Sequence, residues 1–200
     1  MNTLKIIGIN RHKINTDGIG VRTLVGLAGC NLSCKYCINK DILRHPKIKE
    51  YTVLELIKKV MEDYCYFVGT DGGVTFGGGE PLLQIEQIIE FTRQTKSLFK
   101  TYIETSLSIQ TDLEELLNLV YGMFIDIKSI DSSIYENYTG ATNSILLQNL
   151  KVIKDCELQN KCVIRVPTIK EYTTEKSISE SLKFLNDFGF KNIDTFEYFL

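Results

Sequence analysis

Short apolar runs alternate along this chain with longer segments in which apolar residues recur at helical spacing. The short runs predict β-strands, and the longer segments predict amphipathic helices. We expect strands at residues 21–28, 73–76, 101–104, 122–127, 161–166 and 193–198. We expect helices at residues 52–66, 82–99, 145–154 and 174–188, with one more beginning near residue 111. Thr52 and Glu55 form a capping box, Thr111 is expected to cap its helix, and Gly189 is expected to end the last one.

The repeated order of strand, helix and strand predicts an α/β fold in which helices cover a parallel sheet. Six core strands in 200 residues suit an open partial (βα)6 barrel with a curved sheet. A closed barrel of eight strands normally needs more chain. No linker or low-complexity tract interrupts the pattern, so we expect a single domain over residues 1–200. The basic segment around Pro46 is expected to be a surface loop.

Unusual residues gather where the predicted strands end. A cysteine-containing loop follows the first core strand, and glycines follow the second. The segments concerned are 29–39, 77–80, 104–106, 126–128 and 165–167. Because the carboxyl ends of parallel strands share one edge of the sheet, these segments are expected to meet in one cleft.

Composition narrows the classes of function. The net charge of −2 gives no reason to expect binding to nucleic acid or to an anionic membrane. No apolar run is long enough to cross a bilayer, and residues 1–5 lack the apolar core of a signal peptide. We therefore expect a cytoplasmic protein, acting as a monomer, without disulfide bonds.

Three of the six cysteines, Cys30, Cys34 and Cys37, lie on one short loop. Three thiolates so placed can bind three irons of a cubic iron–sulfur cluster and leave the fourth iron free for a substrate or cofactor. The alternative is structural zinc, which normally takes four ligands, often as two close pairs. No second pair exists, and neither His12 nor His45 has a convincing spacing.

The other cysteines, Cys65, Cys156 and Cys162, are scattered among apolar residues and are expected to be small buried side chains.

Four charged residues at predicted strand ends are candidates for contact with a bound ligand. Asp126 and Lys128 are two residues apart on a strand and so point to the same side. They follow a buried apolar run, where a charged side chain needs a partner. Glu104 and Arg165 occupy equivalent positions on neighbouring strands. Structural ion pairs are the alternative reading.

The glycines at 77–79 would let the backbone approach a ligand closely, with the carboxylate of Glu80 beside it, unless they only form a tight turn.

In combination, these motifs resemble the radical S-adenosylmethionine superfamily, and within it the activating enzymes of glycyl-radical enzymes, of the pyruvate formate-lyase activase type. The motifs that carry the resemblance are 16–23, the three-cysteine loop, 72–84, 104–106, 126–128 and 164–167. They extend over nearly the whole chain.

The resemblance implies a role for each candidate. Cys30, Cys34 and Cys37 would bind a [4Fe–4S] cluster whose free iron takes the amino and carboxylate groups of S-adenosylmethionine. The remaining contacts to that cofactor would come from Tyr36 and Ile38 at the nucleoside, Gly78, Gly79 and Glu80 at the amino group, Asp126 and Lys128 near the carboxylate and ribose, Arg165 beside them, and Val166 at the adenine. A monovalent cation would sit by the carboxylate, near Glu104, Thr105 and Asp126.

The implied reaction is reductive. An electron from flavodoxin or ferredoxin would cleave S-adenosylmethionine to methionine and a 5′-deoxyadenosyl radical, which abstracts a hydrogen atom from a glycine of a partner glycyl-radical enzyme. Alternatives are a small-molecule substrate, as in a deazapurine synthase, a peptide substrate, or a non-catalytic electron carrier. The chain departs from the family pattern at Ile38, where many activases have histidine, at Ser106-Leu107-Ser108 and at Lys170-Glu171. These departures leave the identity of the substrate open.

Overall fold

All eight strands of the computed structural model, which describes residues 3–14 and 16–198, belong to one sheet. Its order is β3-β1-β2-β4-β5-β6-β7-β8. The strands are β1 (Thr3–Ile14), β2 (Val21–Leu27), β3 (Lys49–Thr52), β4 (Gly73–Gly78), β5 (Lys100–Thr105), β6 (Gly122–Asp126), β7 (Cys162–Thr168) and β8 (Ile193–Glu197). The six strands from β2 and β4 through β8 are mutually parallel, which confirms the predicted open α/β sheet.

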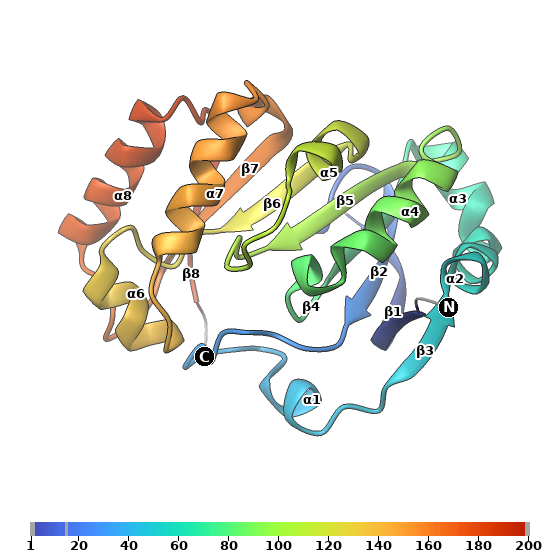
Figure 1. Cartoon of the computed structure of the whole chain (residues 1–200), viewed down its shortest axis with the longest axis horizontal. Coiled ribbons are helices and arrows are strands. Elements are labelled where there is room, and N and C mark those ends of the chain that lie inside the picture. The colour runs from blue at the N-terminus through green and yellow to red at the C-terminus, as the bar shows by residue number, and fades with distance from the viewer. Residues whose placement is uncertain (1–2, 15, 199–200) are drawn as a thin grey trace.

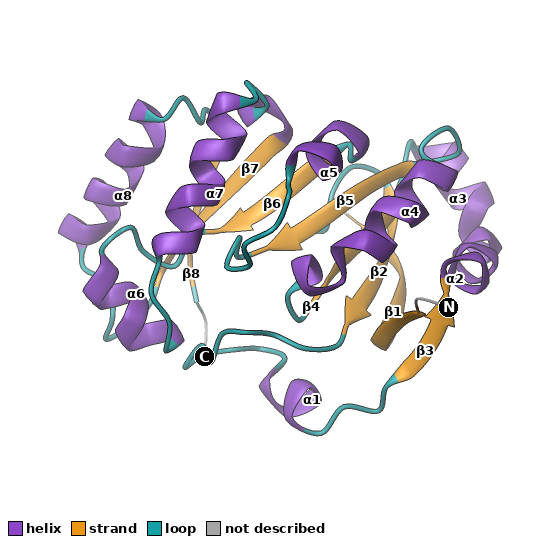
Figure 2. Ribbon diagram, in the orientation of Figure 1, coloured by secondary structure: helices purple, strands orange, loops and turns teal. Residues whose placement is uncertain are grey.

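Helices cover the outer face of this sheet (Figures 1 and 2). They are α2 (Val53–Val60), α3 (Tyr64–Thr70), α4 (Ile85–Thr95), α5 (Glu114–Leu119), α6 (Ser132–Thr139), α7 (Ser144–Asp155) and α8 (Glu175–Asp187), whereas α1 (Lys40–Arg44) lies apart from the sheet. The capping box of Thr52 and Glu55 is present, and Gly189 follows α8 with a φ of 92°, so both predicted helix ends are confirmed. The single helix expected over 52–66 is instead α2 and α3, joined by the 3₁₀ turn Met61–Asp63.

Two strands were not predicted. β1 pairs antiparallel with both β2 and β3, and so extends the parallel sheet at one edge. Its alternation of apolar and polar residues holds only near Leu4 and Ile6, and the polar half contains a register shift and a positive φ of 57° at His12. β3 lies next to Pro46, in the segment expected to be a loop. It was missed because four half-exposed residues give too short a pattern to identify a strand.

Two helix predictions need correction. Helix α6 was missed because its polar sequence lacks a clear apolar stripe, although Asp131 caps it by accepting a hydrogen bond from Ile134 N, and Gly140 follows with a φ of 77°. Helix α5 is not capped by Thr111. It begins at Glu114, whose N–H donates to Asp112 Oδ1 over 3.1 Å.

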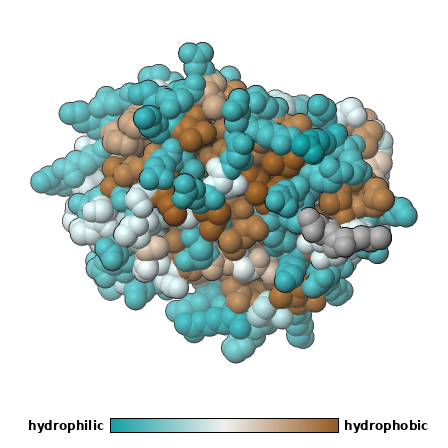
Figure 3. Space-filling model, viewed as in Figure 1, coloured by the Kyte–Doolittle hydropathy of each residue, from teal (hydrophilic) through white to brown (hydrophobic). Residues whose placement is uncertain are grey.

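The hydrophobic core lies between the sheet and the helices. Phe76 of β4 meets Phe91 of α4 edge to face at 5.1 Å between ring centroids, and both side chains are fully buried. On the face seen in Figure 3, hydrophilic side chains project from the helices and hydrophobic residues show mainly between them. Cys162 belongs to this core, whereas Cys65 is exposed and Cys156 is half-buried, so the prediction of three buried cysteines was wrong for Cys65.

The motif at 16–23 lies at the amino ends of the strands, away from the edge where the other motifs gather. Arg22 is fully buried, and its guanidinium donates to Thr75 Oγ1 at 3.1 Å and to the carbonyl oxygen of Lys100 at 3.0 Å. Burial lowers its pKa to about 10. Gly20 packs so closely on α3 that a Cβ atom there would lie 2.3 Å from Thr70 O. This motif therefore holds β2 against β4 and β5.

Candidate cofactor site

The cysteine-containing loop, residues 28–39, connects β2 to α1 at the carboxyl edge of the parallel strands. In Figure 1 the arrows of β2, β5 and β6 point toward the lower part of the view, where this loop crosses beneath the sheet. We predicted from the parallel topology that this loop shares one edge of the sheet with the ends of β4 to β7. The parallel pairing of β2 with β4, and of β4 through β7 with one another, puts these strand ends at the same edge.

Hydrogen bonds fasten this loop on three sides. At the end of α6, Thr139 O accepts from Ser33 N at 2.8 Å and Tyr138 O accepts from Lys35 N at 3.1 Å. On the other sides, Asn31 exchanges hydrogen bonds with Ser108 after β5, and Asn39 Nδ2 donates to Gly78 O over 2.8 Å. The thiols are thus presented by a loop whose backbone is fixed by its neighbours.

The thiols of Cys34 and Cys30 both have raised pKa values. Burial raises the pKa of Cys34 to about 11, although Lys128 opposes it, and Cys30 and Cys37 also contribute. Burial likewise raises the pKa of Cys30. Cys30 itself is exposed to solvent at the rim. The set is therefore three free thiols close together, facing one buried ammonium group.

This donor set fits a cubic iron–sulfur cluster, in which each thiolate binds a different iron and the ligands do not surround a single ion. Within the described ranges, no group of three or more Cys, His, Asp or Glu side chains is arranged to hold one metal ion. Cys65, Cys156 and Cys162 lie on α3, after α7 and at the start of β7, and not on this loop. Cys30, Cys34 and Cys37 therefore share the loop, apart from the other three cysteines, and their role as cluster ligands stays a prediction.

Tyr36 and Ile38 flank Cys37 differently. The ring of Tyr36 contacts those of Tyr138 and Tyr172 at 6.1 and 5.8 Å between centroids, and its hydroxyl donates to Glu171 at 3.3 Å. Ile38 is 89% exposed and touches no core. Tyr36 therefore supports the loop, while Ile38 is available to a ligand or a partner.

The glycines at the end of β4 and directly after it allow two backbone segments to touch. A Cβ on Gly79 would lie 1.9 Å from Gly29 O, at the start of the cysteine-containing loop. A Cβ on Gly77 would lie 2.7 Å from Glu104 Oε2. We predicted that the backbone at these glycines would approach a ligand closely. In the structure, Gly77 and Gly79 closely approach Glu104 and Gly29 of the same chain.

Glu80 is buried, with 1% of its surface exposed, and its carboxylate faces the protein. It accepts hydrogen bonds from Thr105 Oγ1 at 2.6 Å, from Ser106 N at 2.9 Å and Oγ at 2.6 Å, and from Leu82 N at 3.1 Å. Burial raises its pKa, and the donors from Ser106 and Thr105 oppose that rise. The Glu80 side chain joins the ends of β4 and β5, so a ligand amino group would meet backbone groups here and not this carboxylate.

The four charged candidates form one connected network. Arg165 Nε donates to Asp126 Oδ1 at 2.6 Å, and Arg165 Nη1 donates to Glu104 Oε1 at 3.1 Å. Lys128 Nζ lies 3.5 Å from Asp126 Oδ2 and donates to the hydroxyl of Tyr198 at 2.8 Å. This arrangement confirms that Arg165 pairs with strand-end carboxylates. Tyr198 was not predicted, although its place at the end of the last strand was a usable signal.

The local environment favours the charged forms of Lys128 and Arg165. Burial works to lower the pKa of Lys128, but Asp126 and Tyr198 outweigh it and raise that pKa. The pKa of Arg165 is raised in the same way, because Asp126 and Glu104 outweigh its burial. Burial raises the pKa of Glu104, with Arg165 opposing. Two fixed cations beside two carboxylates can bind a zwitterion such as an amino acid moiety.

Val166 alternates with Arg165 along β7 and faces the opposite side of the sheet. Its side chain is 2% exposed and belongs to the hydrophobic core. The predicted adenine contact of this side chain is therefore not supported by its position, and only its backbone lies at the carboxyl edge.

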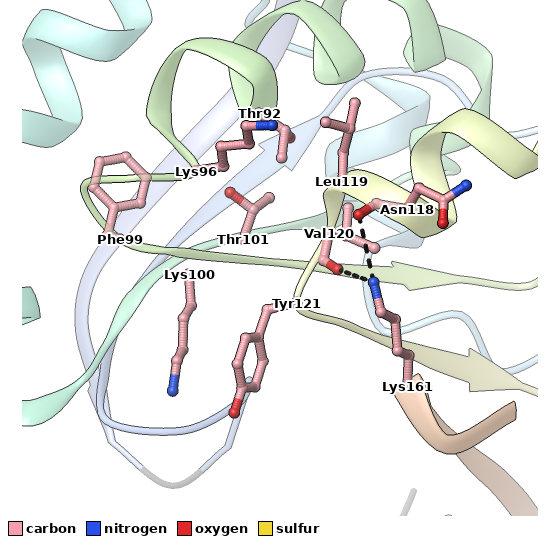
Figure 4. Close-up of a pocket in the computed structure, with 10 residues that line it drawn as sticks. All are labelled: Thr92, Lys96, Phe99, Lys100, Thr101, Asn118, Leu119, Val120, Tyr121 and Lys161. Atoms are coloured by element: carbon pink, nitrogen blue, oxygen red, sulfur yellow. Dashed lines mark hydrogen bonds between the residues drawn. The ribbon is translucent and has the colours of Figure 1, made fainter. Parts of the chain in front are cut away.

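A separate cavity of about 290 Å³ lies at the amino ends of β5 and β6 (Figure 4). There Lys161 Nζ donates to the carbonyl oxygens of Leu117 at 2.7 Å and Val120 at 3.1 Å. None of the predicted site residues lines it. Of the three lysines that line it, Lys161 binds carbonyl groups at the end of α5. The cavity is thus separate from the edge where the predicted site residues lie. No helix in the described part of the chain is long and apolar enough to cross a membrane.

Comparison with known proteins agrees with this geometry. Residues 24–185 match the family model of the Radical SAM superfamily. The chain is 40% identical over 125 residues to the pyruvate formate-lyase-activating enzyme of Clostridium pasteurianum, which covers 62% of this chain and 52% of that protein. It is 28% identical over 186 residues to the pyruvate formate-lyase 1-activating enzyme of Escherichia coli K12, covering 90% of this chain and 74% of that enzyme.

Solved structures share the fold. SuiB of Streptococcus suis bound to S-adenosylmethionine superimposes with a TM-score of 0.67 at 17% identity, over 86% of this chain and 39% of SuiB. Among the relatives found by sequence, the chain spans about half the length of the first two, with 52% of one and 45% of the other covered. Because the family model extends over most of the chain, this protein belongs to the Radical SAM superfamily.

Proposed function

We propose that this protein is an activating enzyme that generates the radical of a glycyl-radical enzyme. The observation that carries the proposal is that a loop with three free thiols shares one edge of the sheet with a connected network of two cations and two carboxylates. The sequence relatives support the substrate class, since their names are those of activating enzymes.

Cys30, Cys34 and Cys37 would hold the [4Fe–4S] cluster, and S-adenosylmethionine would bind beside it. When bound, the cluster supplies the electron that cleaves S-adenosylmethionine to methionine and a 5′-deoxyadenosyl radical. Lys128 has one ammonium hydrogen beyond those facing Asp126 and Tyr198, and it would orient the methionine carboxylate. Asp126 and Glu104, held by Arg165, would accept from the ribose hydroxyls. Backbone groups of Gly78 and Gly79 would face the amino group.

A monovalent cation near Glu104, Thr105 and Asp126 stays part of this proposal. Both carboxylates already share Arg165, so the cation would compete with that guanidinium. Titration of S-adenosylmethionine binding with KCl, against a tetramethylammonium chloride control at equal ionic strength, would test it.

The electron donor would be flavodoxin or ferredoxin, and the protein would act as a monomer in the cytoplasm. The exposed segment 35–49 immediately follows Cys34, and we place the donor on it.

The experiment is electron paramagnetic resonance on an anaerobic extract from a source strain that lacks this gene. Reconstituted protein, S-adenosylmethionine and a reductant are added. We expect a glycyl-radical doublet, which Cys34→Ala abolishes and Cys65→Ala, on an exposed cysteine outside the loop, preserves. Formation of 5′-deoxyadenosine without any doublet would refute the activase and indicate a small-molecule or peptide substrate. Cleavage of S-adenosylmethionine by Cys34→Ala would refute the site.

A further inference from the structure

The ammonium group of Lys128 has two partners among the described residues, and they come from different parts of the chain. Lys128 follows the end of β6 and is buried. Its Nζ lies 3.5 Å from Asp126 Oδ2, on the same strand, and donates to the hydroxyl of Tyr198 at 2.8 Å. A lysine ammonium carries three hydrogens, so these two contacts leave one hydrogen free.

The contact with Tyr198 reaches across the sheet. Tyr198 follows β8, and β7 lies between β6 and β8 in the strand order. The other partner, Asp126, belongs to the strand that carries Lys128 and is itself held by Arg165 Nε at 2.6 Å. Within the described part of the chain, Tyr198 is therefore the one residue from another strand that contacts this ammonium.

Tyr198 is itself held by the two strands beside it. Its N–H donates to the carbonyl oxygen of Thr168, at the end of β7, over 3.2 Å. Its ring meets that of Phe196, in β8, edge to face at 5.5 Å between centroids and an interplanar angle of 81°. The backbone and the ring thus fix where the hydroxyl lies before any ligand binds.

A second partner matters because a lysine side chain is long and flexible, and its ammonium can turn freely about its last bond. One hydrogen bond leaves the other two hydrogens free to rotate about it. Two contacts in different directions fix the whole group, and with it the direction of the third hydrogen. A group that binds a ligand is held in its productive direction by residues behind it in this way.

We propose that Tyr198 is a positioning residue, which directs the free hydrogen of Lys128 toward the methionine carboxylate of S-adenosylmethionine. The inference rests on the proposed function, because it takes Lys128 as the group that receives this carboxylate. Without the hydroxyl, the ammonium keeps only Asp126 and can turn toward it, away from the cofactor. The bond that breaks in the reaction joins sulfur to the 5′ carbon and not to the carboxylate, so the loss should affect binding and not the chemical step.

The test is Tyr198→Phe, which removes one oxygen and keeps the ring, its contact with Phe196 and the backbone bond to Thr168. Formation of 5′-deoxyadenosine by the cluster-loaded protein is measured with dithionite as the reductant. We expect the KM for S-adenosylmethionine to rise about tenfold, as for the loss of a hydrogen bond to a charged group, with kcat unchanged. Iron content and the midpoint of thermal unfolding of this variant should match those of the wild type.

A double-mutant cycle with Lys128→Met tests whether Tyr198 acts through Lys128. If it does, Lys128→Met raises the KM at least as much as Tyr198→Phe, and the double variant raises it no further than Lys128→Met alone. Fold-changes that multiply in the double variant would show that the two residues act independently and would overturn the proposal. An unchanged KM in Tyr198→Phe, or a fall in kcat at constant KM, would overturn it as well.

The matched control is Tyr121→Phe. Tyr121 also contacts a lysine, because Lys100 Nζ lies 4.0 Å from the centroid of its ring, but it precedes β6 at the amino edge of the sheet. This variant should leave both constants unchanged. The proposed function fails in a different way: a wild type that cleaves S-adenosylmethionine with the expected variant effects, but forms no glycyl radical, would refute the activase and leave the role of Tyr198 standing.

Discussion

Single residues at the carboxyl edge mainly contact other segments of the same chain and hold them in place. Gly79 brings the end of β4 against the start of the cysteine-containing loop, and Glu80 accepts three hydrogen bonds from Thr105 and Ser106 at the end of β5. Arg165 joins the carboxylates of two neighbouring strands. The site is therefore stiffened by the residues that the sequence identified as ligand contacts.

Gly79→Ala should destabilise the protein by about 3 kcal/mol, near the upper end of the range for overpacking, because the obstructing atom is backbone. The added Cβ would lie 1.9 Å from Gly29 O. The control is Gly69→Ala in α3, where nothing lies within 4 Å of the new Cβ. It should leave stability unchanged or raise it by up to about 1 kcal/mol. Urea unfolding measures both, and equal effects would show that the close approach is not rigid.

Glu80→Gln should change how stability depends on pH. The pKa of Glu80 is raised in the folded state from an ordinary value of 4.5, so folding binds a proton between these two values. The wild type is therefore most stable, relative to the variant, below pH 4.5, and it loses that advantage as pH rises through the raised pKa. Thermal unfolding of both proteins across this window measures the difference. A difference that is constant, or that grows with pH, would contradict the buried, hard-to-ionise carboxylate.

At the scale of elements, one buried carboxylate adds a side-chain link between the antiparallel strand β1 and its neighbour β2. Asp63, in the 3₁₀ turn between α2 and α3, has 2% of its surface exposed. It accepts from Arg11 of β1 and from Thr23 of β2, each at 2.7 Å. One turn thus holds two strands of different direction.

Asp63→Ala should therefore cost about 3 kcal/mol in the free energy of unfolding, because it leaves the buried Thr23 hydroxyl and Arg11 Nη1 without the acceptor that they share. Glu62→Ala is the control, since Glu62 binds the same Arg11 at 2.7 Å but is 52% exposed in its side chain. It should cost less than about 1 kcal/mol. Comparable losses from the two substitutions in a urea titration would mean that burial does not decide the strength of this contact.

At the scale of the whole molecule, charge is distributed unevenly. Segment 35–49 carries five basic residues and one acidic residue in a chain whose net charge is −2. Helix α1, within it, has no buried residue and stands apart from the other helices in Figure 1. Ile38, Ile42 and Ile48 are exposed there by 89%, 50% and 44%. Basic and apolar groups on one exposed segment beside the cysteines suit an acidic protein partner.

The triple variant Lys40→Glu/Arg44→Glu/Lys47→Glu should raise the KM for a reduced flavodoxin or ferredoxin by about tenfold or more, and weaken its dependence on salt. Cleavage of S-adenosylmethionine driven by dithionite, a small reductant that needs no docking surface, should be unchanged. The control Lys151→Glu/Lys183→Glu/Lys191→Glu makes the same change of net charge on the far side of the molecule. Equal effects of the two triple variants would show that overall charge, and not this segment, governs the encounter.

Much of this architecture follows from local pattern. The six parallel strands were found because each is a short apolar run between turn signals, and the capping box at Thr52 was found because it is a contact within one helical turn. The strands β1 and β3 were missed because the apolar alternation of β1 holds only near Leu4 and Ile6, and β3 has only four residues. Helix α6 was missed because tertiary contacts, and not a regular apolar stripe, bury its tyrosines.

The sequence by itself determined which residues gather at the carboxyl edge, because strand direction follows from the order of the elements and each motif follows a strand. Only the tertiary structure decided what those residues touch. It turned the Glu80 carboxylate toward β5, placed Val166 in the core, and brought Tyr198 to Lys128. The physical reason is that backbone pattern is a local property, whereas the partner of a buried polar group depends on which distant segments pack around it.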